Sequence, residues 1–267
     1  MRDLRIVMDR TAVDRSLAIA PVDEHVRNAA GAACLGLIVT LIDVSGATLA
    51  LAAASPDWPA TADLAYQAIG PITNGPALAE ASVVRRGSNS VVIAVDVFDG
   101  LGQEDVAGAR HAGAGLMTFA RIPRRASTVT VDPAGSGGQR TTMARADSHL
   151  SAPLLQRIGL RLVDGGVGAA ELHKTEYVRN SFGTINGGVV GMTVQGSAEA
   201  ACAAVGRRLV ATDVQVHYLA QIRAGPLRAT AHVLRVAEDH AVCRVQAVDA
   251  SQDDLVTALA SVTLQEW

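Results

Sequence analysis

The chain contains two long apolar runs, at 33–54 and 188–205, and each is followed by segments in which apolar and polar residues alternate. An apolar run of this length is typical of a buried α-helix, whereas alternation with a period of two predicts strands that bury one face. A further strand-like run precedes each helix. The predicted strands lie at 16–26, 61–69, 77–84, 91–98 and 115–122 in the first half and at 169–178, 212–222, 227–236, 242–248 and 255–264 in the second. We therefore predict an α+β chain in which each long helix is wrapped by an antiparallel sheet.

The two halves resemble each other in sequence at nearly constant offsets. An offset of 152 aligns residues 24–36 with 176–188, and an offset of 150 aligns residues 63–99 with 213–249. The offset changes near Ser-Pro-Asp-Trp-Pro, which is typical of a loop, and an insertion confined to a loop favours a duplicated unit over chance matching. The identical pairs are Glu24/Glu176, Val26/Val178, Arg27/Arg179, Asn28/Asn180, Gly31/Gly183, Gly36/Gly188, Asp63/Asp213, Gly75/Gly225, Pro76/Pro226, Ala81/Ala231, Val83/Val233, Arg85/Arg235 and Asp99/Asp249.

Length and composition agree with two fused units. At ~150 residues per domain, 267 residues fall just short of two domains. We predict domains at 1–122 and 154–267, joined by a linker at 123–153 that contains Gly-Ser-Gly-Gly. Aromatic residues make up only 3% of the chain, so we expect a core of Ala, Val, Leu and Ile. The balance of 23 basic and 26 acidic residues, without a basic stripe, argues against partners such as nucleic acid or a membrane surface.

The cysteines and the apolar segments indicate a cytoplasmic protein. Cys34, Cys202 and Cys243 are too few and too widely spaced for a disulfide framework or a C-x-x-C zinc site, and the first residues lack the apolar core of a secretory signal. Residues 31–54 are long enough to span a membrane, but Asp43 lies near their middle and no Lys/Arg-rich flank accompanies them. We therefore interpret this segment as a buried helix with an embedded acid.

The turns that open the two helices carry a recognisable motif. N-x-x-G, followed by a Gly pair and an apolar helix with one acid, resembles the hotdog-fold acyl-CoA thioesterases of the phenylacetate-pathway type. The resemblance covers both halves and implies a double hotdog. In that family the turn reads N-x-x-G-x-x-H-G-G, with an acid nine residues after the His. The second half reads N-S-F-G-T-I-N-G-G, with Asn186 in the place of the His, and the first reads N-A-A-G-A-A-C-L-G, with Cys34 there and Leu35 in place of the first Gly of the pair.

The resemblance implies one complete site and one incomplete site. Nine residues after the His position lie Asp43 and Gln195, and the family's water-holding Ser or Thr, eighteen residues after the acid, corresponds to Thr61 in one half and Ala211 in the other. Since family sites combine the Gly turn of one hotdog with the acid of another, we expect one competent composite site. Its residues would be Asn180, Asn186, Gly187 and Gly188 facing Asp43 and Thr61. The mirror site, with Asn28, Cys34 and Leu35 facing Gln195 and Ala211, is expected to be inactive.

The chemistry expected at the competent site is thioester hydrolysis. Backbone N–H groups of Gly187 and Gly188 at a helix start would stabilise an oxyanion. Asp43, among apolar neighbours, should be desolvated and have a raised pKa, which suits a base; whether it activates water or attacks the carbonyl stays open. Arg85 and Arg86 are candidate contacts for the phosphates of coenzyme A.

Structural alternatives stand beside each of these assignments. Asp43 could be a buried acid satisfied by backbone, Thr61 a β-branched strand residue, and the asparagines turn formers. The glycines could serve helix packing, and the two arginines could belong to a solvated hairpin.

We predict a cytoplasmic acyl-CoA thioesterase with a small-molecule substrate. The alternative is a non-catalytic acyl-CoA-binding hotdog protein, and a hotdog dehydratase is a weaker one because no His is placed to take a proton near the helix. We expect no metal site, since the seven His lack H-x-x-x-H spacing, and no cofactor apart from coenzyme A as part of the substrate. G-x-S-x-G, P-loop and dinucleotide motifs are also missing from the sequence. A homodimer of double hotdogs is left open.

Overall fold

The computed structural model describes residues 2–10, 14–123, 139–163, 165 and 167–267, and these form two compact units. The N-terminal unit consists of Arg2–Pro21 and Leu41–His149, and the C-terminal unit of Val22–Thr40 and Leu150–Trp267. The long helix α1 (Leu35–Ala54) contributes residues 35–40 to the C-terminal unit and the remainder to the N-terminal unit. The Gly-Ser-Gly-Gly segment of the predicted linker lies outside the described residues.

Within the described residues, the N-terminal unit contains seven antiparallel strands in the order β7-β1-β2-β4-β5-β6-β3. Residues 41–54 of α1 pack tightly on this sheet, since a Cβ added at Gly46 would lie 2.5 Å from Met117 Sδ in β6. The buried hydroxyl of Ser16 in β2 donates to the Ser45 carbonyl oxygen at 2.7 Å. The strands are β1 (Val7–Asp9), β2 (Arg15–Ala20), β3 (Trp58–Ala68), β4 (Ala77–Arg86), β5 (Ser90–Asp99), β6 (Arg110–Ile122) and β7 (Arg140–Thr142).

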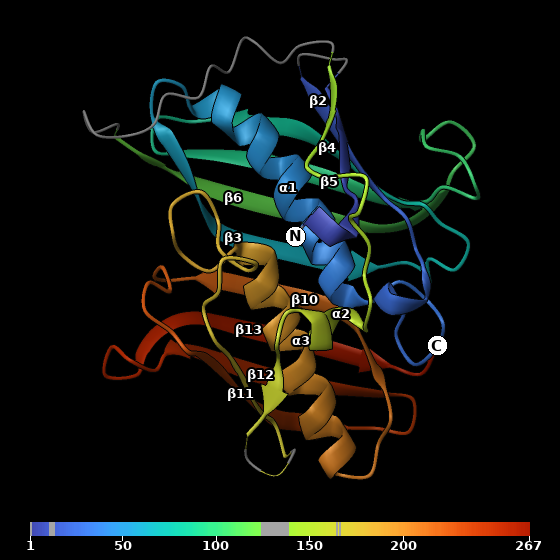
Figure 1. The fold of residues 1–267 in the computed structure, drawn as a ribbon, viewed down its shortest axis with the longest axis vertical. Coiled ribbons are helices and arrows are strands. Elements are labelled where there is room, and N and C mark those ends of the chain that lie inside the picture. Colours follow the sequence, from blue (N-terminus) through green and yellow to red (C-terminus); the bar gives the residue numbers. More distant parts are fainter. Residues whose placement is uncertain (1, 11–13, 124–138, 164, 166) are drawn as a thin grey trace. The chain divides into compact units, whose positions relative to one another are not determined.

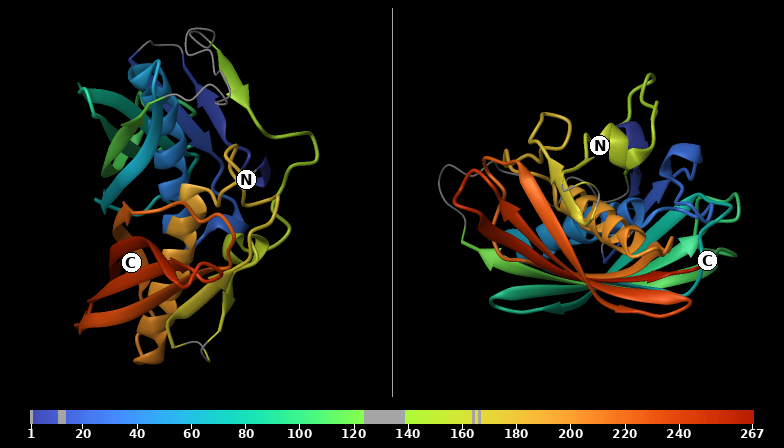
Figure 2. Two further views of the ribbon diagram at one scale, coloured as in Figure 1. Left: turned by 90° about the vertical axis from the view of Figure 1, so that its left-hand side faces the viewer. Right: turned by 90° about the horizontal axis from the view of Figure 1, so that it is seen from below.

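The part of the C-terminal unit that the structure describes contains six antiparallel strands in the order β10-β13-β12-β11-β9-β8. Helix α3 (Gly187–Ala204) lies along one face of this sheet, as Figures 1 and 2 show, and the short α2 (Leu154–Arg157) packs near it. Residues 35–40 of α1 pack against the first half of α3. The strands are β8 (Arg161–Leu162), β9 (Ala169–Leu172), β10 (Val210–Tyr218), β11 (Leu227–Val236), β12 (His240–Asp249) and β13 (Leu255–Gln265).

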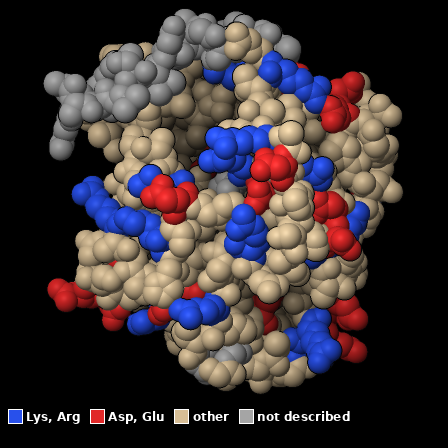
Figure 3. Space-filling view, viewed as in Figure 1, with Lys and Arg blue, Asp and Glu red and all other residues tan. Residues whose placement is uncertain are grey.

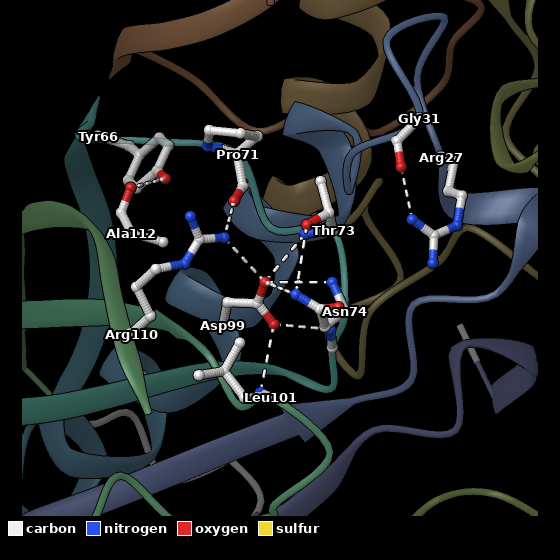
Figure 4. A network of polar contacts seen from close by, with 11 residues as sticks. Arg27, Gly31, Tyr66, Pro71, Thr73, Asn74, Asp99, Leu101, Arg110 and Ala112 are labelled. Atoms are coloured by element: carbon white, nitrogen blue, oxygen red, sulfur yellow. Dashed lines mark hydrogen bonds and ion pairs between the residues drawn. The ribbon is translucent and has the colours of Figure 1, made fainter. Parts of the chain in front are cut away.

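Equivalent structural devices occur at both members of the sequence-matched pairs. Register shifts that indicate β-bulges fall between Thr61 and Asp63 in β3 and between Ala211 and Asp213 in β10. Asp99 accepts hydrogen bonds from the backbone N–H groups of Thr73, Asn74 and Gly75 (Figure 4), and Asp249 accepts them from Arg223, Ala224 and Gly225. The two halves therefore build the same local geometry at the predicted offset of 150.

The alternation of apolar and polar residues predicted the main elements correctly. Both long helices and the four strands that follow each of them are confirmed, with boundaries that shift by a few residues. The strand-like runs before the helices are shorter than predicted, because β2 ends at Ala20 and β9 at Leu172, and a 3₁₀ helix occupies Glu24–Val26. The short β1, β7, β8, α2 and the 3₁₀ helix Arg2–Leu4 were not predicted.

Helix α1 is long and apolar enough to cross a membrane by length and composition alone, and within the described residues it is the one helix that meets this test. Because 67% of its most apolar window is buried inside the protein, the same observation fits a core helix.

Acidic and basic side chains are interspersed on the face seen in Figure 3.

Candidate functional site

The carboxylate of Asp43 meets the hydroxyl of Thr61 in the N-terminal unit. Asp43 lies on α1 with only 8% of its surface exposed, so the predicted burial is confirmed. Thr61, half-buried on β3, donates from Oγ1 to Asp43 Oδ1 at 3.4 Å. The adjacent β-bulge interrupts the alternation of the strand, and such irregularities turn a side chain away from the regular sheet direction. The eighteen-residue spacing seen in the sequence therefore corresponds to a real contact.

The start of α3 is capped by its own asparagine. Asn186 is the N-cap residue, and its Oδ1 accepts a hydrogen bond from Gly188 N at 2.9 Å. The Gly188 N–H is thus already used, whereas no hydrogen bond from Gly187 N, the first helical position, is found within the part of the chain that the structure describes. The hydroxyl of Tyr218 on β10, which the sequence did not single out, donates to the Gly187 carbonyl oxygen at 3.1 Å and holds this turn in place.

Gly188 is also required by helix packing. A Cβ at this position would lie 2.6 Å from Thr40 Oγ1 and 3.1 Å from Thr40 Cα. Contacts under 3.0 Å are not found for real Cβ atoms, so glycine permits the close approach of residues 35–40 to α3. The packing interpretation of Gly188 therefore has a direct structural basis, whereas its binding of substrate stays a prediction.

Asn180 and Asn28 shape equivalent turns before the two helices. Asn180 Oδ1 accepts from the N–H groups of Phe182 and Thr184, and Asn28 Oδ1 accepts from those of Ala30 and Ala32. Their amide nitrogens differ: Asn180 Nδ2 donates to Thr184 Oγ1 at 2.8 Å, whereas the buried Asn28 Nδ2 finds no acceptor within the part of the chain that the structure describes. These contacts favour turn formation as the role of both asparagines.

The start of α1 is capped from another helix. The Cys34 carbonyl oxygen accepts from Leu37 N and Ile38 N, so Cys34 occupies the position that Asn186 has in α3. A thiol is a weak acceptor, and the Gly36 N–H donates instead to Gln195 Oε1 of α3 at 2.7 Å. Gln195 is 2% exposed. Gln195, which was assigned to the mirror site, thus contacts the helix start that follows Cys34 within the C-terminal unit.

Glu199 belongs to the same group of contacts, and the sequence did not point to it. Gln195 Nε2 donates to Glu199 Oε1 at 3.0 Å, and Ala211 N of β10 donates to the same oxygen at 3.2 Å. Desolvation raises the pKa of the Glu199 carboxyl, although the hydrogen bonds from Ala211 and Gln195 oppose the rise. Desolvation also raises the pKa of the nearby Cys34 thiol to about 12, so this cysteine is a neutral thiol at pH 7.

Arg85 and Arg86 lie exposed at the end of β4, in the hairpin closed by the hydrogen bond from Gly87 N to the Ser90 carbonyl oxygen. This placement agrees with a solvated hairpin and leaves both guanidinium groups accessible. Their contact with coenzyme A phosphates stays a prediction.

The comparisons with known proteins identify the fold. Residues 182–256 match the family model of the thioesterase superfamily, and no curated protein matches the chain. Three similar solved structures cover almost the whole chain: the tesB protein of Mycobacterium avium subs paratuberculosis, an acyl-ACP thioesterase of Bacteroides thetaiotaomicron, and a protein of Alicyclobacillus acidocaldarius described as having a hot dog fold. The chain adopts the hotdog fold. The predicted α+β hotdog architecture is therefore confirmed.

These similarities are structural and extend over both halves. The tesB protein is 10% identical with a TM-score of 0.61, and the match covers 97% of this chain and 94% of that one. The acyl-ACP thioesterase is 9% identical with a TM-score of 0.56, covering 94% and 98%. The Alicyclobacillus protein is 10% identical with a TM-score of 0.55, covering 97% of each chain. At such identities the hotdog fold is shown, and the activity has to be argued from the residues.

Proposed function

We propose that this chain hydrolyses the thioester bond of an acyl-CoA, using Asp43 and Thr61 together with the start of α3. The observation that carries the proposal is the buried carboxylate of Asp43 with the Thr61 hydroxyl 3.4 Å from it. A buried acid on an apolar helix is costly unless it has a purpose, and a strand hydroxyl beside it can hold a water molecule. The match of residues 182–256 to the thioesterase superfamily supports the same reaction class.

The proposed chemistry assigns one task to each group. Asp43 either removes a proton from water or attacks the carbonyl carbon itself, and Thr61 holds the water. The Gly187 N–H and the N-terminal dipole of α3 stabilise the negative charge that develops on the carbonyl oxygen. The C–S bond then breaks, and coenzyme A leaves as the thiol after its sulfur takes up the proton removed from water. If Asp43 attacks directly, the acyl group stays on it as an anhydride until the held water hydrolyses it; in both cases the acyl group leaves as a carboxylic acid.

The contact between Gly36 and Gln195 supports a composite arrangement of the site. At the offset of 152, Gln195 corresponds to Asp43, and Gly36 corresponds to Gly188. Gln195 on one helix meets the glycine that opens the other at 2.7 Å. We propose the same relation for the matching pair, in which Asp43 serves the turn at Gly187 and Gly188.

The test is the release of coenzyme A thiol from a panel of acyl-CoA esters. We expect Asp43→Asn to lower the turnover number. The part of the thioester hydrolysis that depends on Asp43 should fall by ~10²-fold or more, as is usual for loss of a general base. Asp96→Asn makes the same chemical change at a half-exposed carboxylate of β5 and should leave turnover unaltered.

Equal rates for the wild type and Asp43→Asn would contradict the assignment of Asp43. A wild-type chain that binds a non-hydrolysable acyl-CoA thioether but releases no thiol from any ester would favour the non-catalytic binding protein instead.

A further inference from the structure

Two helix carboxylates reach the same position of the two sheets. Asp43 contacts Thr61, and Glu199 contacts Ala211, which is the residue matched to Thr61 at the offset of 150. Glu199 does not match Asp43 in sequence, because the matched residue is Gln195, one helical turn earlier. A residue four positions on lies on the same face of the helix, about 6 Å further along it.

Glu199 is connected to the start of α1 through Gln195. The contacts run from Gly36 N to Gln195 Oε1 at 2.7 Å, and from Gln195 Nε2 to Glu199 Oε1 at 3.0 Å. All of these groups lie in the C-terminal unit. The Gln195 amide oxygen accepts a hydrogen bond from the Gly36 N–H at the start of α1. A thioester carbonyl oxygen is also an sp² oxygen and could accept the same hydrogen bond in its place.

The surroundings of Glu199 suit a base. Glu199 is intermediate in exposure as a residue, and desolvation raises the pKa of its carboxyl. The ionisable groups that sense its charge include the thiols of Cys34 and Cys202, whose pKa values are both raised by burial, so they are neutral at pH 7. Both described hydrogen bonds use Oε1, and they fix the orientation of the carboxylate.

We propose that Glu199 is the base of a second acyl thioester site, formed with Gln195 and the Gly36 N–H in the C-terminal unit. This inference rests on the proposed function, because it assigns the same reaction and substrate class to a second place. It departs from the expectation that the mirror site is inactive. That expectation rested on Cys34, Leu35, Gln195 and Ala211, and it did not take Glu199 into account.

The reaction at this site balances with water as the one co-reactant. The thioester carbonyl oxygen replaces Gln195 Oε1 on the Gly36 N–H, and Glu199 Oε2 takes a proton from water as the water oxygen bonds to the carbonyl carbon. The C–S bond breaks with its electron pair on sulfur, and the protonated Glu199 returns the proton to the thiolate. The products are the carboxylic acid and coenzyme A thiol, and Glu199 ends as it began.

The test compares Asp43→Asn, Glu199→Gln and the double variant by thiol release from the same acyl-CoA panel. Glu199→Gln is a conservative change, because its amide oxygen still accepts from Gln195 Nε2 and Ala211 N. We expect Asp43→Asn to retain turnover that rises with pH as Glu199 loses its proton, and the double variant to fall at least ~10²-fold below it. Melting temperatures of all variants, compared with that of the wild type, show that each is folded.

A double variant as active as Asp43→Asn would overturn the assignment of Glu199 while leaving the proposed function intact. Conversely, if Asp43→Asn turned over as fast as the wild type and Glu199→Gln were inactive, the result would support this site and contradict the Asp43 site. Titration calorimetry with a non-hydrolysable acyl-CoA thioether provides a readout independent of turnover. We expect two molecules per wild-type chain, and one molecule per chain would overturn the second site.

Discussion

Replacing Gly188 with alanine tests whether the contact between α1 and α3 requires glycine. The new Cβ would lie 2.6 Å from Thr40 Oγ1 and 3.1 Å from Thr40 Cα. Thr40 must then rotate, which breaks its 2.7 Å hydrogen bond to the Gly36 carbonyl oxygen, or the two helices must move apart. Overpacking costs about 1–3 kcal/mol, and the higher helix propensity of alanine returns up to ~1 kcal/mol. The expected net loss of stability is therefore about 1–2 kcal/mol.

Differential scanning calorimetry measures this loss as a lower transition midpoint, by about 2–8 °C for a chain of this size. Gly70→Ala is the matched control, because a Cβ there meets no atom within 4 Å, and its midpoint should stay or rise slightly. Thr40→Ala removes the Oγ1 atom, so combining it with Gly188→Ala should cost less than the sum of the single changes. A Gly188→Ala variant as stable as the wild type, or strictly additive effects, would refute the packing argument.

Two further predictions concern buried polar groups. Burial opposes ionisation of Asp99, but hydrogen bonds from Asn74, Arg110, Thr73 and Gly75 outweigh it and lower its pKa to about 2. Because the pKa is lower in the folded state than the unfolded value of ~3.9, ionised Asp99 stabilises the fold by roughly 2 kcal/mol above pH ~3.9, and this stabilisation is lost as the pH falls toward 2. Asp99→Asn should therefore have a lower melting temperature at pH 7. Its free energy of unfolding should also change less between pH 4 and 2 than that of the wild type. Thr184→Ala removes the partner of Asn180 Nδ2 and should cost ~1–3 kcal/mol, whereas Ala32→Thr supplies the matching hydroxyl for the buried Asn28 Nδ2 and should raise the melting temperature. Unchanged melting in Thr184→Ala, or a lower one in Ala32→Thr, would contradict this account.

The fold could be predicted largely because its core elements are long and their patterns are strong. The residues of α1 form one long apolar run, and those of strands such as β5 and β12 alternate between buried and more exposed positions. Both patterns follow from which side chains are buried, so the residue types alone indicate the element. The short strands β1, β7 and β8 contain two or three residues each. At that length, pairing with a neighbouring strand decides the conformation, and a local pattern carries little information.

The candidate site could be predicted only where the resemblance to the hotdog thioesterases supplies a motif. In that family a Ser or Thr lies eighteen residues after the acid, which points to Thr61, and its hydroxyl does contact Asp43. Glu199 was not predicted because it lies one helical turn beyond Gln195, the residue matched to Asp43, and no motif spacing marks that position. The use of the Gly188 N–H by Asn186 was missed as well, since a capping bond depends on the rotamer of the cap residue.

The capping of α1 by Gln195 means that positions 34 and 195 cannot change independently. Restoring an acid with Gln195→Asp alone would shorten the side chain and remove the acceptor of the Gly36 N–H, because Cys34 offers no oxygen to replace it. With Cys34→Asn in place first, α1 would have a cap of its own, as α3 has in Asn186, and position 195 would be released. We expect melting temperatures to show this order dependence, so the mutational path to a symmetric pair of sites begins at Cys34.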